Sequence, residues 1–172
     1  MALPVSVATW VSAPAVSAAF GAQDRAALQS ASAHGSRIAW APSVVLCGMG
    51  LACVLGALVL PEPVLSPQMA LVFAVMLCGA LGQAFWASGY TVATLTDGPA
   101  LSFAARLIVL AGYLAMAFGQ GAGLSALGNA LAYVVAMSAG SFWLWMALRR
   151  RCGVDTSAAV LWRDGGLLWR TF

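Results

Sequence analysis

Long apolar runs with at most one charge, separated by short polar turns, set the pattern of the chain. A helix crosses the roughly 30 Å hydrocarbon core of a membrane with about 20 residues, because each residue adds about 1.5 Å. Four runs reach this length. They predict an all-α integral membrane protein, a bundle of four transmembrane helices at about residues 38–60, 68–90, 100–118 and 124–148.

The runs end at residues that stop or turn a helix. Pro61-Glu62-Pro63 closes the first run, and residues 91–99, which contain Asp97, Gly98 and Pro99, are predicted as the loop after the second. The glycine-rich stretch 119–123 separates the third run from the fourth. We therefore predict that residues 38–148 form one four-span membrane domain.

Both ends of the chain are expected to lie outside this domain. Residues 5–20 are apolar but short and contain Pro14, which predicts an N-terminal helix stub. The polar, alanine-rich stretch 22–36 predicts a cytoplasmic connecting helix near the membrane surface, so residues 1–37 form the N-terminal segment. Residues 149–172 mix tryptophan and leucine with charges, which predicts a cytoplasmic interfacial tail.

The composition and the distribution of charged residues exclude several classes of function. Hydrophobic residues make up 62% of the chain and charged residues 8%, which leaves no length for a soluble catalytic domain. The arginines do not form a basic stripe, so nucleic acid is not an expected partner. The four cysteines have no metal-ligand spacing and the spans hold no nucleophile and base, so we expect no metal, no cofactor and no enzyme activity.

The eight arginines predict an orientation. If Arg149, Arg150 and Arg151 are cytoplasmic, residues 61–67 and 119–123 lie outside the cell and contain no arginine or lysine. Basic residues concentrate in cytoplasmic loops. We therefore predict a multi-pass protein with a cytoplasmic C-terminus.

Few polar side chains lie within the predicted spans. Arg106 is the one charged residue among them, and either its side chain reaches back to the headgroups or it binds an anionic headgroup of a substrate. Gln83 and Asn129 are expected to form hydrogen bonds between helices rather than to bind a ligand.

Small residues recur at intervals of four in at least three spans, which is typical of closely packed membrane helices. Alanine and glycine are common in this chain, so such ribbons can also arise by chance. The predicted helix-packing residues are Gly48, Ala52 and Gly56 in the first span and Gly128, Ala132, Ala136 and Gly140 in the fourth.

Four motifs resemble the C-terminal portion of bacterial polysaccharide flippases, in the multidrug/oligosaccharidyl-lipid/polysaccharide exporter superfamily. The residues that carry the resemblance are APAVSAAFGAQDR at 13–25, QAFWASG at 83–89 followed by LTDG at 95–98, GLSALGNALA at 123–132, and RRRCGVDT at 149–156. The likeness covers most of the chain, from about residue 8 to residue 157, and each motif consists mainly of small residues at helix boundaries.

The resemblance implies a transporter in the bacterial inner membrane. Such a flippase moves polyprenyl-diphosphate-linked oligosaccharide by alternating access of two lobes, and this chain matches only the later part of the second lobe. It implies membrane lipid and lipid-linked oligosaccharide as partners, together with a missing N-terminal half or another membrane subunit. Arg106 and Arg37 are then the expected substrate-binding residues. The alternative is a self-contained four-span scaffold or accessory subunit of a membrane complex.

Overall fold

The structure is a computed structural model that describes residues 3–59, 65–96, 98–119, 125–157 and 159, with side chains from Trp10 onward. These residues contain five α-helices and no strand, so the predicted all-α fold is confirmed. Helices α2 to α5 are each long and apolar enough to cross a membrane. The helices are α1 (Leu3–Gly21), α2 (Arg25–Val59), α3 (Pro67–Thr96), α4 (Pro99–Gly119) and α5 (Ala126–Cys152).

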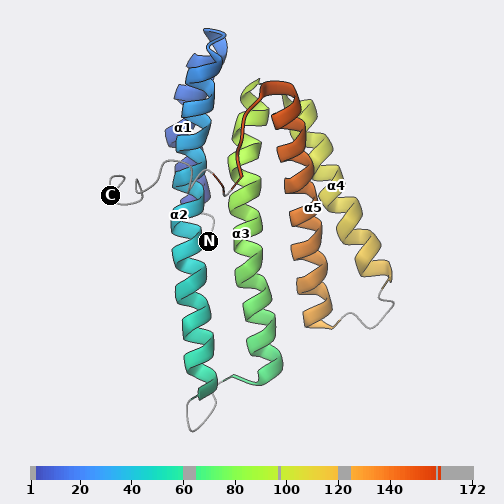
Figure 1. Ribbon diagram of the computed structural model, residues 1–172. Helices are drawn as coiled ribbons and strands as arrows, with labels where there is room; N and C mark the ends of the chain where they lie inside the picture. The colour runs from blue at the N-terminus through green and yellow to red at the C-terminus, as the bar shows by residue number, and fades with distance from the viewer. Residues whose placement is uncertain (1–2, 60–64, 97, 120–124, 158, 160–172) are drawn as a thin grey trace.

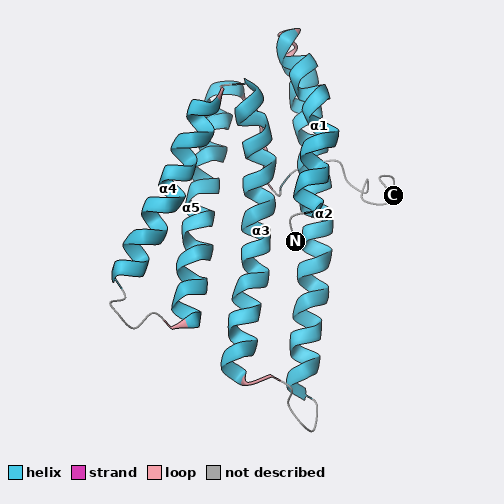
Figure 2. Cartoon of the chain, turned by 180° about the vertical axis from the view of Figure 1, so that it is seen from behind, coloured by secondary structure: helices cyan, strands magenta, loops and turns pink. Residues whose placement is uncertain are grey.

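Successive helices run in opposite directions (Figure 1). The turn from α1 to α2, the turn from α3 to α4 and the C-terminus of α5 therefore lie at one end of the bundle. We call this the arginine end, because Arg25 and Arg149–Arg151 lie there. Seen from behind in Figure 2, the α1–α2 pair stands beside α3, with α4 and α5 on the other side of α3.

Helix α2 joins two elements that the sequence predicted as separate. It contains 35 residues, about 52 Å of helix, and runs unbroken from the predicted connecting helix through the predicted first span. Asp24 caps its start, because the Asp24 Oδ1 accepts a 3.0 Å hydrogen bond from the backbone N–H of Ala27. The predicted connecting helix ends at residue 36 and the predicted first span begins at residue 38, but no residue there stops the helix. The connecting helix is therefore not a separate element.

Helix α1 is longer than the predicted stub. It contains 19 residues and continues through Pro14. A proline removes one backbone hydrogen bond, and packing of the face that carries Val16 and Ala19 holds the helix together on the C-terminal side of Pro14. The Pro14 interruption is therefore absent, and α1 packs antiparallel to α2 (Figure 2).

Helix α3 continues six residues beyond Tyr90, the predicted end of the second span, to Thr96. The hydroxyls of Thr91 and Thr96 donate to the carbonyls of Ala87 and Val92, at 3.1 and 2.8 Å. These bonds satisfy the hydroxyls within the helix, so threonine does not require a loop here. Val92 is buried, which gives the extra turns a packed face.

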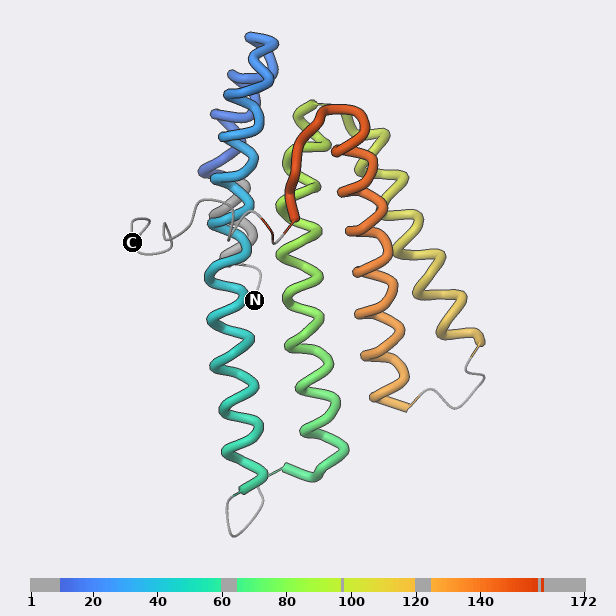
Figure 3. The backbone as a smooth tube through the Cα atoms, viewed as in Figure 1, coloured from blue at the N-terminus to red at the C-terminus, as the bar shows by residue number. Residues whose placement is uncertain are grey.

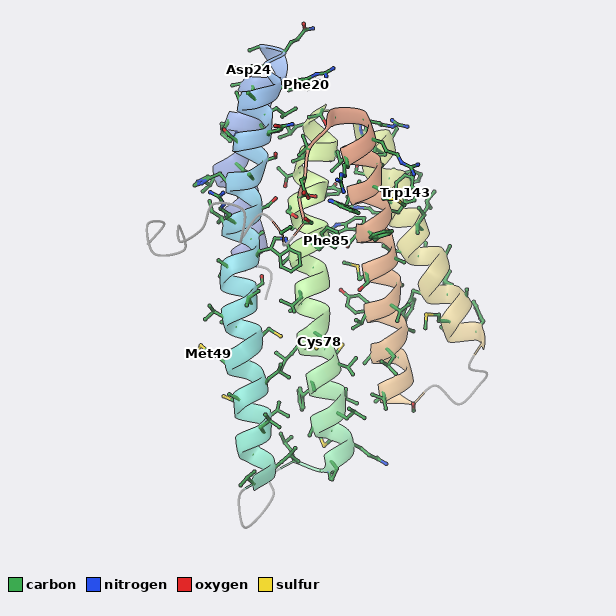
Figure 4. The ribbon with its side chains drawn as sticks, viewed as in Figure 1. Phe20, Asp24, Met49, Cys78, Phe85 and Trp143 are labelled. Atoms are coloured by element: carbon green, nitrogen blue, oxygen red, sulfur yellow. The ribbon has the colours of Figure 1, made fainter. Side chains whose placement is uncertain are left out.

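The apolar core lies at the arginine end. Its fully or nearly buried members come from all five helices and from the segment after α5: Val16, Ala19, Leu28, Val92, Ala93, Leu101, Ala105, Leu144, Leu148 and Val154. The other half of α2 differs, because Met49 and Val59 are 61% and 84% exposed. Figure 4 shows Met49 on the outer side of α2, away from α3.

Residues 153–157 fold back into the bundle, and we call them the C-terminal strap. Gly153 ends α5 with a left-handed φ of 68°, a conformation that glycine adopts readily. The chain then runs back beside α3 toward α2, as the end of the tube in Figure 3 shows. Val154 and Thr156 are fully buried. This part of the predicted interfacial tail therefore lies between helices, and residues 160–172 lie outside the described residues.

Candidate functional site

A groove of about 350 Å³ opens on the side of the bundle between α3 and α4, with α5 beneath it. Three helices position its walls, and aromatic, apolar and cationic side chains share its surface. The lining residues are Trp86, Arg106, Val109, Leu110, Tyr113, Tyr133 and Met137. This mixture makes the groove the best candidate for a functional site in the described part of the chain.

Close packing of α4 on α5 creates the groove. Gly140 is buried, and a side chain added there would collide with Val109 of α4. At Gly112, an added Cβ would lie 3.6 Å from the Cβ of Ala136. Helix α4 therefore rests against the small residues of α5, and it moves away from α3 below the turn that joins them (Figure 1).

Arg106 lies at the end of the groove nearest the arginine end. Its guanidinium Cζ is 4.7 Å from the centroid of the Tyr90 ring, which stacks at 5.9 Å on the ring of Trp86. Within the described residues no carboxylate forms an ion pair with Arg106, and its side chain is exposed. A guanidinium held by a ring face keeps its hydrogen-bond donors available for an anion.

Two polar pairs lie farther along the same groove. The side-chain amide of Gln83 donates a 2.6 Å hydrogen bond to the hydroxyl of Tyr133, which joins α3 to α5. The hydroxyl of Tyr113 donates a 2.5 Å bond to the Asn129 Oδ1, which joins α4 to α5. Gln83 and Asn129 therefore form the interhelical hydrogen bonds that the sequence predicted.

The two predicted substrate-binding arginines lie apart. Arg106 lines the groove, whereas Arg37 is half-buried on α2, a helix that contributes no residue to the groove. The structure therefore does not bring Arg37 and Arg106 together in one site.

The predicted packing ribbons also fall in different environments. In α5, Ala132, Ala136 and Gly140 are buried, and Gly128 is half-buried. In α2, Gly48, Ala52 and Gly56 are exposed, and a Cβ at either glycine would meet nothing within 4 Å.

The packed face of α2 is formed by residues outside the predicted ribbon. Its buried members are Leu28, Ser32, Gly35, Ser36, Ala39, Ser43 and Cys47. The ribbon of Gly48, Ala52 and Gly56 takes no part in packing within the described chain, because it lies on the other face of the helix.

Sequence reasoning missed Tyr90, Tyr113 and Tyr133 as members of the site. These are the three tyrosines of the chain, and all three come together around the groove or its cation. The sequence could have identified them, because the chain has few tyrosines and they lie within or next to apolar runs. A tyrosine hydroxyl in a membrane span needs a polar partner.

The described residues contain no cluster of three or more His, Cys, Asp or Glu side chains that could hold a metal ion. The groove offers a cation, ring faces, two neutral hydrogen-bonded pairs and apolar walls. These groups suit binding of an amphipathic anion. No family model, curated protein or solved structure matches the chain.

Proposed function

We propose that the chain is the C-terminal part of a membrane transporter for polyprenyl-diphosphate-linked oligosaccharides. The groove carries this proposal, because it places an accessible guanidinium, aromatic rings and an apolar wall side by side in a four-span bundle. The four motifs that resemble polysaccharide flippases support the same substrate class.

Each part of such a substrate has a matching surface in the groove. Arg106 can donate two parallel hydrogen bonds to phosphate oxygens. The rings of Trp86 and Tyr113 offer flat apolar faces for sugar rings, and their polar atoms lie at the edges. Val109, Leu110 and Met137 provide an apolar surface for the polyprenyl chain.

The orientation we propose places the arginine end in the cytoplasm, following the positive-inside rule. Arg106 then lies about 10 Å along α4 from the cytoplasmic start of that helix at Pro99. From this depth the Arg106 side chain can reach back toward the diphosphate of a lipid-linked substrate in the cytoplasmic leaflet. The groove would extend from there toward the opposite leaflet.

A transporter of this kind needs a second wall for the groove. The groove opens to the side of the bundle, and Leu110 in its wall is 53% exposed. We propose that the missing wall comes from an N-terminal half or from another membrane subunit, as the flippase resemblance implies.

An export assay in the native host tests the proposal. Chromosomal Arg106→Gln should reduce surface polysaccharide to a small fraction of the wild-type amount at equal protein level, because the diphosphate loses its cationic partner. Arg150→Gln is the matched control, since Arg150 is exposed at the end of α5 and does not line the groove. Unchanged export with Arg106→Gln would remove the proposed contact.

The outward ribbon of Gly48, Ala52 and Gly56 favours a second candidate, an accessory subunit whose α2 packs against a partner helix. Gene deletion distinguishes the two candidates. Loss of polysaccharide export supports the transporter, whereas normal export together with stable co-purification of a membrane partner supports the accessory subunit.

A further inference from the structure

The C-terminal strap connects two parts of the bundle that otherwise meet mainly along α3. One part is the α1–α2 hairpin and the other is the group α3, α4 and α5 (Figure 2). The strap begins on α5 and runs back beside α3 toward α2 (Figure 3). It therefore lies across the seam between the hairpin and α3 at the arginine end.

Backbone carbonyls of the strap accept hydrogen bonds from both sides of this seam. On the α2 side, the Gln29 amide donates to the Gly153 carbonyl at 3.1 Å, and the Trp40 indole N–H donates to the Thr156 carbonyl at 3.4 Å. On the α3 side, the Ser88 hydroxyl shares its proton between the same Thr156 carbonyl at 3.2 Å and the Phe85 carbonyl one turn back in α3 at 2.9 Å. Removing the strap would break all three bonds.

The strap is also tied to α5. The indole N–H of Trp145 donates a 2.9 Å hydrogen bond to the Asp155 Oδ1, and the backbone N–H of Ser157 donates to the same atom at 3.0 Å. These bonds fix the turn after Gly153, so the carbonyl of Thr156 is directed toward α2 and α3.

The seam beneath the strap is rich in hydroxyls. A cavity of about 10 Å³, close to the size of one water molecule, lies among Ser12, Ser32, Gly35, Ser36, Ser88 and Thr91 of α1, α2 and α3. Ser36 is 1% exposed and Thr156 is fully buried, and neither side-chain hydroxyl has a hydrogen-bond partner in the described part of the chain.

Unpaired buried hydroxyls make this seam easier to hydrate than an apolar one. A buried hydroxyl without a partner destabilises the closed state, and water satisfies it when the seam opens. The buried hydroxyls of Ser102 and Ser141, within the α3, α4 and α5 group, differ because they donate to the carbonyls of Pro99 and Gly82. The unpaired hydroxyls of Ser36 and Thr156 therefore lower the free-energy cost of opening the seam between the hairpin and α3.

We propose that the C-terminal strap is a reversible latch that holds the seam between the α1–α2 hairpin and α3 closed at the arginine end. In the closed state the strap carbonyls bridge α2 and α3. In the open state the strap leaves, and water hydrates the hydroxyls of Ser36 and Thr156. This inference does not depend on which substrate the protein moves.

Cysteine labelling in lipid nanodiscs tests the latch, because both membrane faces are then accessible to a water-soluble maleimide. The four native cysteines are first replaced by alanine. Val154→Cys then reports on the strap, Ala159→Cys serves as the exposed reference, and Ala105→Cys reports on the buried core of α4. When the strap opens and closes faster than the maleimide reacts, the labelling rate of Val154→Cys is proportional to the fraction of molecules with an open strap.

Two variants should change labelling at Val154→Cys in opposite directions. Trp40→Phe with Ser88→Ala removes both donors to Thr156 and should raise the labelling rate about tenfold or more. Thr156→Val keeps the side-chain shape and removes a buried hydroxyl that has no hydrogen-bond partner within the described residues of the closed state, so it should lower the rate about threefold or more. A general loss of stability would not produce the second effect.

Ala105→Cys separates opening of the seam from unfolding of the bundle. It should stay slow in both variants, because α4 remains packed on α5 when the strap leaves. Equal labelling of Val154→Cys and Ala105→Cys would overturn the proposal, since it would indicate global unfolding. A Thr156→Val rate equal to or above that of the unsubstituted strap would overturn it independently.

Discussion

Arg106 of α4 lies over the ring of Tyr90 of α3, with 4.7 Å between the guanidinium Cζ and the ring centroid. This contact joins two helices that diverge along most of their length (Figure 1). It directs the cation that the described residues give the groove across the space between the two helices. Tyr90 is therefore a positioning residue for Arg106 and need not contact a ligand itself.

Loss of the Tyr90 ring should weaken binding of a polyprenyl-diphosphate-linked sugar. Tyr90→Leu removes a cation–π contact that contributes about 0.5–2 kcal/mol, so affinity should fall about 2- to 30-fold. Tyr90→Phe keeps the ring and should bind like the wild type. Equilibrium binding in nanodiscs checks both variants, and equal affinity for Tyr90→Leu and Tyr90→Phe would remove the positioning role.

Two glycines of α2 should respond oppositely to alanine. At Gly35 an added Cβ would lie 2.6 Å from the Cβ of Ser12, so Gly35→Ala should lower the free energy of unfolding by about 1–3 kcal/mol through overpacking. At Gly48 an added Cβ meets nothing within 4 Å, so Gly48→Ala should be neutral or raise stability by up to about 1 kcal/mol. Unfolding in SDS, followed by circular dichroism, measures both.

The double variant Ser12→Gly with Gly35→Ala is the control for this pair, because it reopens the space at the α1–α2 contact. It should recover much of the stability lost in Gly35→Ala. If Gly48→Ala instead proved the more destabilising of the two single variants, the α2 face assigned to packing would be incorrect.

The hydrogen bond between Gln83 and Tyr133 should contribute to the stability of the bundle. Tyr133→Phe removes the acceptor of the Gln83 amide, and interhelical hydrogen bonds in membranes contribute about 0.6 kcal/mol on average and up to about 1.7 kcal/mol. A loss in this range is expected in the same SDS titration. The double variant Gln83→Leu with Tyr133→Phe should recover part of it, because no unpaired amide then remains, and no recovery would argue against the bond.

Asp155 predicts a pH dependence of stability. Burial raises the pKa of the Asp155 carboxyl, but the hydrogen bonds from Trp145 and Ser157 and the charge of Arg149 outweigh this effect and hold the pKa below its ordinary value of 3.8. A lowered pKa in the folded state stabilises the protein above pH 3.8, and this contribution is lost as the pH falls through the lowered value.

Thermal unfolding between pH 6 and pH 2.5 checks this prediction in the wild type and in Asp155→Asn. The two proteins should differ most at about pH 5 and above, with the wild type more stable, and the difference should shrink as the carboxyl is protonated. A difference that stays constant across this range would show that the charge of Asp155 does not stabilise the fold.

The sequence predicted the four long apolar helices correctly, because the length of an apolar run alone determines whether a helix can cross a membrane. It did not predict their ends. Thr91 and Thr96 look like loop residues, yet their hydroxyls bond to carbonyls one turn back and the helix continues. Pro14 looks like a break, yet α1 continues through it and buries Val16 against the bundle.

The face of α2 that packs could not be read from spacing. Small residues occur on two faces of this helix, and the buried one carries Ser32, Gly35 and Ser36 rather than Gly48, Ala52 and Gly56. Which face is buried depends on where α1 and α3 lie. The strap was missed for a similar reason, because Val154 stands alone among polar residues and has no periodic partner.

The groove was predicted only in part. Arg106, Gln83 and Asn129 stood out because polar groups are costly within a membrane. Their aromatic neighbours Tyr90, Tyr113 and Tyr133 come from three helices, so only the folded arrangement brings them together. Arg37 and Arg106 were both expected to bind the substrate, yet Arg37 lies on α2, outside the groove.

We propose that Arg106 makes the groove selective for a lipid-linked diphosphate. Equilibrium binding in nanodiscs tests it most directly, with a synthetic polyprenyl-diphosphate-linked disaccharide and the uncharged polyprenol of the same length. Arg106→Gln is compared with the exposed control Arg150→Gln. A charged hydrogen-bonding partner contributes about 1.5–3 kcal/mol, so Arg106→Gln should bind the diphosphate about 10- to 150-fold more weakly, with polyprenol binding and Arg150→Gln unchanged. Equal diphosphate affinity for Arg106→Gln and the wild type would contradict the claim.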